Sequence, residues 1–378
     1  MRQIGLYIHV PFCTGKCDYC SFYSITPTAR QVRRYFEALR CELDLIRERY
    51  FGSQTPTLSS VFIGGGTPTW LEPQPLAELM AMVHRHFILT DDCEVTSETS
   101  PETIEPEKML TLVQTGVNRV SLGAQSFHDD LLRRIGRRHR RADIFLALEH
   151  IRSAGISNIN MDMIFGLPGE DLAAWQEDVR TAVDQGPVHL ACYELTYEPG
   201  TPLANRCVPK LDEDVLIRMY YQTKDMLESA GFEHYEISNY ARPGFKCRHN
   251  LRYWRNQDYI GLGPAGAGYL DKTRYNNVAD LDKYCSDLLE EHKLPIANLE
   301  QRRGLQLAGE TAMVNLRTSE GIVQDEFIEQ TGLDPFIIYA ETLDRFGRAG
   351  LLEIVGNRIR LSRSGLILAN EVIAELIC

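Results

Sequence analysis

The chain has 378 residues, of which 44% are hydrophobic and 24% charged, a composition typical of a globular protein with one large and one smaller domain. Its formal net charge of −12 argues against nucleic acid as a partner, because phosphate contacts need clustered Lys and Arg. Neither a signal-peptide pattern nor a run of 18 apolar residues is present. We therefore expect a cytoplasmic protein that meets a membrane at most through a partner.

The first half of the chain alternates short apolar runs with amphipathic stretches, the pattern of parallel strands joined by helices. Six strands are predicted, over residues 5–9, 60–64, 94–98, 119–123, 160–164 and 189–195. The helices predicted between them cover residues 29–49, 75–86, 105–114, 142–154 and 172–185. Periodicity alone fits both a doubly wound sheet and an open barrel of six β/α units.

The second half predicts a different organisation. A helix over residues 212–230 is followed by a segment rich in Tyr, Gly, Asn and Arg, which predicts a loop-rich joining region. Helical patterns return at residues 301–316, 323–330 and 335–349, followed by a hairpin (352–355 and 358–361) that turns at Gly356-Asn357 and a helix over 363–376. We expect three parts: residues 1–230, a joining region 231–300, and a small winged-helix-like α+β domain over 301–378.

Three cysteines near the start, Cys13, Cys17 and Cys20, have the spacing CxxxCxxC. Three thiolates on one short loop are typical of a four-iron cluster in which one iron stays open to a small molecule. Structural zinc usually takes four protein ligands in CxxC pairs, which the neighbouring sequence does not complete. The spacing therefore favours an iron–sulfur cluster over a zinc site.

The cysteine motif follows the run Tyr7-Ile8-His9-Val10-Pro11 and has an aromatic residue before its last cysteine. In these features the segment resembles the radical S-adenosylmethionine (SAM) superfamily. Within that superfamily it is most similar to the branch of oxygen-independent coproporphyrinogen III oxidases and HemW-type haem chaperones. The resemblance implies a partial (β/α)6 barrel with its site at the carboxyl ends of the strands. It also implies that the three cysteines hold a 4Fe-4S cluster whose open iron takes the amino and carboxylate groups of SAM.

The resemblance also implies a set of SAM contacts at successive strand ends. The run Gly64-Gly65-Gly66-Thr67 follows an apolar strand, where glycines let the backbone approach a ligand closely. Asp162 is a candidate on physical grounds as well, because an acid between two methionines on a buried strand costs desolvation unless it has a partner. The expected contacts are Tyr7, Tyr19, Gly65, Gly66, Thr67, Glu98, Gln125, Arg137 and Asp162. For Glu98 the alternative is a solvated loop acid, and for the two tyrosines plain packing.

Two features separate the oxidases from the chaperones. The oxidases carry a longer N-terminal arm and a fourth cysteine two residues after the third, where this chain has Phe22. Here His249-Asn250-Leu251-Arg252-Tyr253-Trp254 instead resembles the chaperones' HNxxYW motif. An imidazole can ligate haem iron and aromatic rings offer flat apolar faces, so His249, Tyr253 and Trp254 are the expected haem contacts. The alternatives are an ordinary loop role for His249 and attachment at Cys247.

The leading hypothesis is a chaperone that binds haem, carries a SAM-coordinated 4Fe-4S cluster and hands haem to an unidentified acceptor protein, as a monomer or homodimer. One alternative is an enzyme that oxidatively decarboxylates the propionates of coproporphyrinogen III. Another is a HemN-like radical methyltransferase that uses a second SAM. The sequence assigns no catalytic residue, and it leaves both a carrier and an enzyme open.

Overall fold

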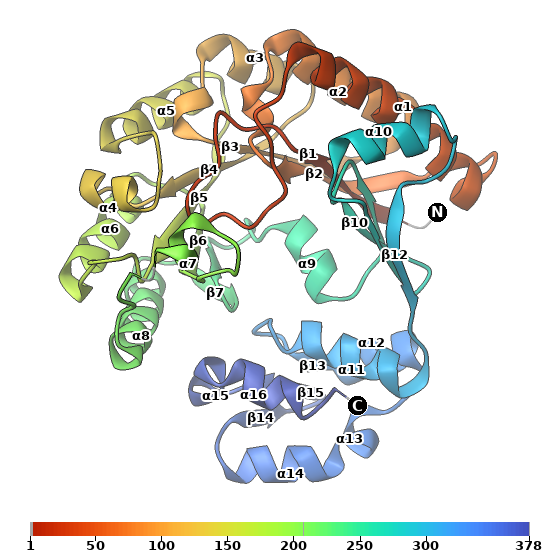
Figure 1. The fold of residues 1–378 in the computed structure, drawn as a ribbon. Helices are drawn as coiled ribbons and strands as arrows, with labels where there is room; N and C mark the ends of the chain where they lie inside the picture. The colour runs from red at the N-terminus through yellow and green to blue at the C-terminus, as the bar shows by residue number, and fades with distance from the viewer. Residues whose placement is uncertain (1–2, 207, 378) are drawn as a thin grey trace.

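The structure is a computed structural model that describes residues 3–206 and 208–377, and its centre is an open barrel of parallel strands (Figure 1). Six parallel strands follow chain order: β1 (Gln3–Val10), β2 (Thr57–Gly65), β3 (Ile88–Thr99), β4 (Arg119–Gln125), β5 (Asn158–Phe165) and β6 (His189–Glu194). The helices between them are α1 (Ala29–Phe51), α2 (Pro73–His86), α3 (Pro106–Gln114), α4 (Asp129–Arg134), α5 (Arg141–Ser153) and α6 (Leu172–Asp184). The predicted barrel of six β/α units is confirmed, with its helices on the outside.

Local sequence explains where α1 begins and which face it buries. Thr28 and Gln31 form a capping box that satisfies free N–H groups of the first turn. Tyr35, Leu39 and Leu43 recur every four residues and are all buried, so one stripe of the helix packs on the sheet. Two short 3-10 turns, Pro68–Trp70 and Pro101–Thr103, follow β2 and β3.

The barrel has an apolar outer layer and a polar interior. Successive side chains of a strand point to opposite faces. On β5, Met161 and Met163 belong to the apolar core, whereas Asn160 and Asp162 line a cavity inside the barrel. The parallel sheet thus buries its outer face under helices and leaves polar groups for a ligand inside.

Residues 231–300 contain more regular structure than the predicted loops. They form β7 (Glu233–Glu236), β8 (Asn239–Ala241), α9 (Arg248–Trp254), β9 (Tyr259–Leu262), β10 (Ala267–Leu270), β11 (Thr273–Asn277), α10 (Leu281–Leu289) and β12 (Ile296–Gln301). β8 pairs with β6, and β9 pairs with β1, so this segment extends the barrel sheet at both edges. These strands have three to six residues each, too few for a periodic pattern to show.

Before this segment come α7 (Pro202–Asn205) and α8 (Glu213–Ser229), which matches the predicted helix 212–230 within one residue at each end. After β12 the chain enters the C-terminal part, which has its own core. It comprises α11 (Gly304–Asn315), β13 (Ile322–Val323), α12 (Gln324–Thr331), α13 (Pro335–Ile338), α14 (Ala340–Arg348), β14 (Leu352–Val355) and β15 (Arg358–Leu361). The predicted hairpin is present, and its sheet has the order β13-β15-β14. The predicted last helix is split at Leu368 into α15 (Arg363–Ile367) and α16 (Ala369–Ala374).

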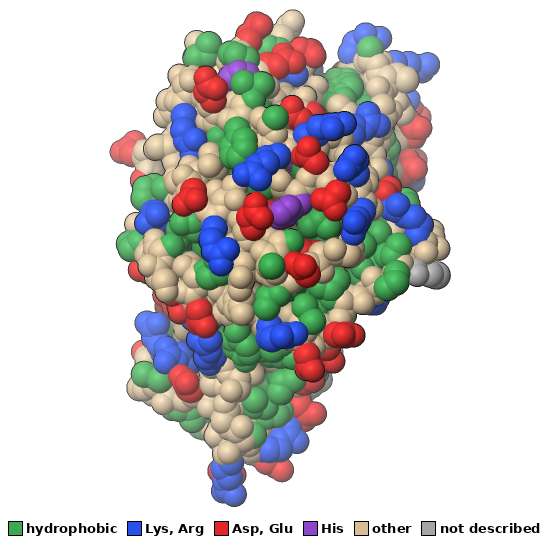
Figure 2. All heavy atoms as spheres, turned by 90° about the vertical axis from the view of Figure 1, so that its left-hand side faces the viewer, with side chains coloured by type: hydrophobic (Ala, Val, Ile, Leu, Met, Phe, Trp, Pro, Cys, Tyr) green, Lys and Arg blue, Asp and Glu red, His purple; other side chains and the backbone are tan. Residues whose placement is uncertain are grey.

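The outer face of the barrel carries both charge signs. Figure 2 shows blue and red side chains interspersed over the face that lies to the left in Figure 1. Arg134 of α4 pairs with Asp130, and Arg141 of α5 pairs with Glu177, so both arginines have acidic neighbours. None of the helices in the described residues is long and apolar enough to span a membrane.

Candidate functional site

The three motif cysteines lie on the loop between β1 and α1, at the carboxyl end of the barrel strands. All three are partly exposed, whereas Cys93 and Cys247 are buried. The loop is held by backbone bonds from Cys13 N to the carbonyl of Ile25 (3.0 Å) and from Cys20 N to that of Cys17 (3.2 Å). The sequence therefore builds an ordered loop with three accessible thiols.

The donor set fits a four-iron cluster. Within the described residues, no three His, Cys, Asp or Glu side chains converge on one point, as the ligands of a single metal ion would. Three thiolates on one loop are the ligands that a four-iron cluster with one open iron takes, each thiolate on a different iron. Polar groups also lie beside the sulfur atoms: Thr67 Oγ1 is 3.6 Å from Cys13 Sγ, and Arg137 Nη1 donates to Cys17 Sγ at 3.4 Å.

The glycine run after β2 lets two loops approach closely. Gly65 has a φ of +101°, and a Cβ there would lie 2.4 Å from the His9 ring. Gly66 N donates to Val10 O (2.9 Å), Thr67 N to a neighbouring carbonyl (2.7 Å), and Gly65 N to Glu98 Oε2 (2.9 Å). In this conformation the three N–H groups are therefore used within the protein, and the glycines fit the cysteine loop against β2.

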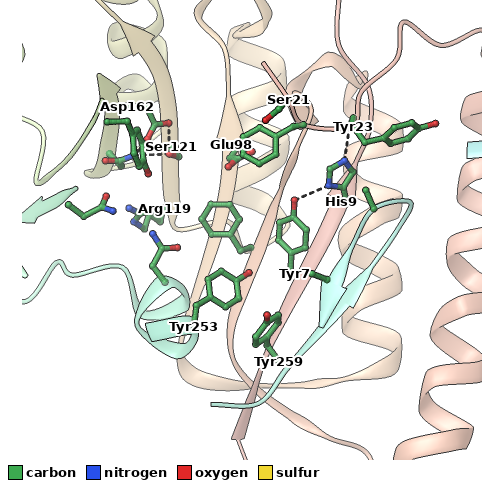
Figure 3. A pocket seen from close by; sticks show the side chains of 18 of the residues that line it. Tyr7, His9, Ser21, Tyr23, Glu98, Arg119, Ser121, Asp162, Tyr253 and Tyr259 are labelled. Atoms are coloured by element: carbon green, nitrogen blue, oxygen red, sulfur yellow. Dashed lines mark hydrogen bonds between the residues drawn. The ribbon is translucent and has the colours of Figure 1, made fainter. Parts of the chain in front are cut away.

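A cavity of about 590 Å³ occupies the barrel interior beneath this loop (Figure 3). Among the predicted SAM contacts, Tyr7, Glu98 and Asp162 line it. Tyr253, a predicted haem contact, lines the same cavity. The structure thus gathers residues from β1, β3, β5 and α9 around one space.

Burial dominates the electrostatics of the cavity. Burial, and then the neighbouring Asp162, raise the pKa of Glu98 to about 8. Burial also raises the pKa of Asp162, although Ser121 Oγ (3.0 Å) and Asn160 Nδ2 (2.8 Å) donate to its carboxylate. Burial lowers the pKa of His9 to about 4. A neutral His9 donating from Nε2 to Tyr23 O (2.8 Å) accepts from the Tyr7 hydroxyl at Nδ1 (3.0 Å).

Arg137 contacts the cysteine loop, and Gln125 lies at the carboxyl end of β4. The Arg137 guanidinium donates to Ser100 Oγ (2.8 Å), to the Gly123 carbonyl (2.9 Å) and to Cys17, so it is fixed from several sides. Gln125 ends β4 with a φ of +67°, which is uncommon for a residue with a side chain. Such a conformation tends to persist where function requires it. Tyr19 packs on a small apolar cluster that includes Leu131.

The HNxxYW motif lies at the opposite end of the barrel from the cysteines. His249 is fully buried on α9, with Nδ1 2.9 Å from Ser60 Oγ and Nε2 2.7 Å from the Tyr253 hydroxyl. Its ring stacks on Phe62 at 5.5 Å, and burial lowers its pKa to about 3. Glu94 accepts from His249 N at 3.1 Å. α9 therefore closes the amino end of the barrel, and both ring nitrogens of His249 are occupied.

Trp254, the third predicted haem contact, stands at the far end of α9. Its carbonyl accepts from Asn315 Nδ2 of α11 at 2.7 Å, and its indole N–H is buried without a partner. The structure therefore brings His249 and Tyr253 together and places Trp254 toward the C-terminal part.

Sequence reasoning missed Arg119 and the polar pair Ser121 and Asn160, all of which line the cavity. A signal was present: Arg119 opens a strand predicted to be buried, and a cation there costs desolvation unless it has a partner. The same reasoning had identified Asp162.

Two family models match the chain. Residues 7–182 match the Radical SAM superfamily, and residues 305–368 match the HemN C-terminal domain. A solved structure described as coproporphyrinogen III oxidase (HemN) from Escherichia coli, a radical SAM enzyme, aligns with a TM-score of 0.86, covering 100% of this chain and 90% of that one. At 21% identity, that likeness concerns the fold. Fold and cysteine motif together define a radical SAM protein.

Full-length relatives give the narrower assignment. The protein named heme chaperone HemW from Bacillus subtilis is 34% identical over 97% of both chains. Its namesake from Mycobacterium tuberculosis is 36% identical over 100% of this chain and 95% of its own. The Escherichia coli protein of that name is 32% identical over 99% and 98%. The chain belongs to the HemW heme chaperone family.

Proposed function

We propose that this protein binds haem and hands it to an acceptor protein in the cytoplasm, while it carries a SAM-coordinated 4Fe-4S cluster. The observation that carries the proposal is the identity of 32–36%, over at least 97% of this chain, with three proteins named heme chaperone HemW. The barrel, the α9 region and the C-terminal part all fall within the matched length. We therefore propose, for the whole chain, the activity after which these relatives are named.

Cys13, Cys17 and Cys20 are the proposed cluster ligands. A bound cluster supplies an electron-transfer centre and an open iron that coordinates SAM. Arg137 places a positive charge beside Cys17, and the Thr67 hydroxyl lies beside Cys13. Both groups can therefore donate hydrogen bonds to the sulfur atoms of a bound cluster.

The proposed SAM contacts surround the upper part of the cavity. Tyr7, Glu98 and Asp162 line it, Gln125 ends β4, and Arg137, between α4 and α5, contacts Cys17. Because Glu98 has a raised pKa, it can donate as well as accept when it meets the ribose hydroxyls. Tyr19, Gly65, Gly66 and Thr67 complete the proposed SAM site.

His249, Tyr253 and Trp254 remain the proposed haem contacts, and the geometry sets a condition on them. His249 Nε2 is bonded to the Tyr253 hydroxyl at 2.7 Å, so ligation of haem iron through Nε2 requires that hydroxyl to move. Tyr253→Phe removes the hydroxyl and keeps the ring. If His249 is the ligand, Tyr253→Phe should keep or strengthen haem binding and His249→Ala should abolish it. Unchanged binding in both variants would exclude His249.

The cluster is tested separately from the haem. We expect anaerobic reconstitution with iron and sulfide to give the broad visible absorbance of an iron–sulfur cluster, and Cys13→Ser to abolish it. Cys93→Ser, which changes a buried cysteine elsewhere, is the matched control and should leave the absorbance unchanged. Equal absorbance in the two variants would contradict the cluster assignment.

A further inference from the structure

We propose that Arg119 binds a carboxylate of a ligand that enters the barrel and is distinct from SAM. The inference rests on the proposed function, under which this carboxylate is a propionate of haem. Under this proposal, one end of the cavity binds a ligand carboxylate. Neither the family match nor the cysteine motif assigns that role to any residue.

Arg119 is buried without adequate partners. It is 2% exposed, at the first position of β4. Its Nε has no hydrogen-bond partner, and Nη1 reaches Thr96 Oγ1 only at 3.5 Å. Burial lowers the pKa of Arg119, but nearby groups that include Glu94 and Asp162 raise it overall, although neither acid is hydrogen-bonded to the guanidinium. A buried guanidinium whose Nε has no hydrogen-bond partner is costly, and a bound carboxylate would offset that cost.

The neighbouring acids are bonded to other groups. Glu94 accepts from the backbone N–H groups of Arg248 and His249, both at 3.1 Å. Asp162 accepts from Ser121 and Asn160. Arg137, which also lies in this barrel, has its donors occupied, whereas Nε of Arg119 has no partner.

Arg119 adjoins the cavity. Arg119 is the only Lys or Arg among the described residues that line it, and Asn160 and Asn239 add neutral amide groups. In Figure 3, Arg119 lies on the same wall as Ser121 and Asp162, opposite Tyr7 and Tyr259. A guanidinium presents a planar fork of N–H groups that matches a carboxylate, and burial of Arg119 strengthens such a pairing.

The carboxylate of SAM is expected near the opposite end of β4 from Arg119. Arg119 begins β4 and Gln125 ends it, and six residues of strand span about 20 Å. The methionine end of SAM is proposed to lie beyond Gln125, at the cysteine loop. A second ligand with a flexible acidic arm fits the Arg119 end better, and each haem propionate is such an arm.

The test compares haem with its dimethyl ester, in which both propionates are blocked, on the cluster-reconstituted full chain. We expect Arg119→Gln to weaken haem binding about 10- to 100-fold, the range for a hydrogen bond to a charged group. The ester should bind the unmodified protein with a similar loss, and Arg119→Gln should add no further loss for the ester. Arg152→Gln, which removes an exposed arginine on α5, should change neither affinity.

The possible results distinguish a failure of the Arg119 assignment from a failure of the proposed function. If neither haem nor its ester binds the unmodified protein, both this inference and the proposed function fail. If haem binds and esterification makes no difference, only the Arg119 assignment fails. If Arg119→Gln weakens SAM binding and spares haem, the carboxylate belongs to SAM and the inference is wrong. If Arg119→Gln does not fold, Arg119→Lys takes its place in the haem-binding measurement. Because it keeps the charge, Arg119→Lys should retain part of the haem affinity of the unmodified protein.

Discussion

At position 65 two independent constraints require glycine. The backbone has a φ of +101°, and a Cβ would lie 2.4 Å from the His9 ring, which links Tyr7 to the Tyr23 carbonyl. Gly65→Ala should therefore lower the free energy of unfolding by about 3–5 kcal/mol, because backbone strain and displacement of a buried ring add. Urea denaturation measures this loss.

Gly155→Ala is the matched control. Gly155 has a similar φ of +94°, but nothing lies within 4 Å of its Cβ position. In Gly155→Ala, only backbone strain should lower the free energy of unfolding, by about 1–3 kcal/mol. Equal losses at positions 65 and 155 would show that His9 moves freely, contrary to its role in holding Tyr7.

Glu98 predicts a pH dependence. Its pKa is about 8 in the folded ligand-free protein against 4.5 as an ordinary value, so the folded state binds more protons between these limits. Its contribution to stability is therefore present at pH 5 and is lost as the pH rises through 8. Because the side chain is partly open to the cavity, we expect this loss to be about 1–3 kcal/mol.

Glu98→Gln should remove that part of the pH dependence and leave the free energy of unfolding at pH 5 nearly unchanged. Urea titrations at pH 5 and pH 8 give the comparison. Asp91→Asn, at an exposed position on the same strand, should leave the pH dependence as it is. An unaltered pH dependence in Glu98→Gln would mean that the carboxyl is ionised at neutral pH.

At the scale of elements, α9 is the least expected feature. Its seven residues close the amino end of the barrel, with Glu94 accepting the N–H groups of its first turn. Glu94→Ala should cost about 2–4 kcal/mol, because it leaves one buried and one partly buried N–H group unpaired. Glu72→Ala removes an exposed acid at the start of α2 that makes no cap bond, and should cost less than about 0.5 kcal/mol.

For both variants, thermal unfolding measures the loss of stability, and hydrogen exchange measures the protection of the α9 amides. If Glu94→Ala left the α9 amides as protected as in the unmodified protein, the helix would be held by its side chains instead. That result would move the support of α9 to the His249, Ser60 and Tyr253 bonds.

The six barrel strands were predictable because each is long and apolar enough to show its period. Asp162 was predictable from one strand, because a buried acid needs a partner. The position of α9 was not, since it depends on β8 pairing with β6 and β9 pairing with β1, and both strands are three or four residues long. The motif His249 to Trp254 was recognisable as a pattern, but no local signal places it opposite the cysteines.

At the scale of the whole molecule, the C-terminal part docks on the barrel through α11. Glu310 is 3% exposed and accepts from Arg274 Nε of β11 at 2.8 Å. Arg274→Ala should lower the free energy of unfolding by about 2–4 kcal/mol, because it leaves a buried carboxylate nearly unpaired. Asp225→Ala breaks an ion pair with Arg363 in which both partners are half exposed, and should cost less than about 1 kcal/mol.

Limited proteolysis together with urea denaturation locates this loss. We expect Arg274→Ala to expose cleavage sites between β12 and α11, while Asp225→Ala does not. If the two variants lost stability equally, the surface pair would be holding the C-terminal part, and the buried Glu310 contact would not.

The most direct test of the whole account is anaerobic. The reconstituted protein is loaded with haem and mixed with a haem-free acceptor such as apomyoglobin, while coproporphyrinogen III turnover and methylated products are assayed in parallel. We expect stoichiometric haem binding, transfer to the acceptor, and neither decarboxylated nor methylated product. Decarboxylated product without stable haem binding would contradict this expectation and would make this protein an oxidase despite Phe22.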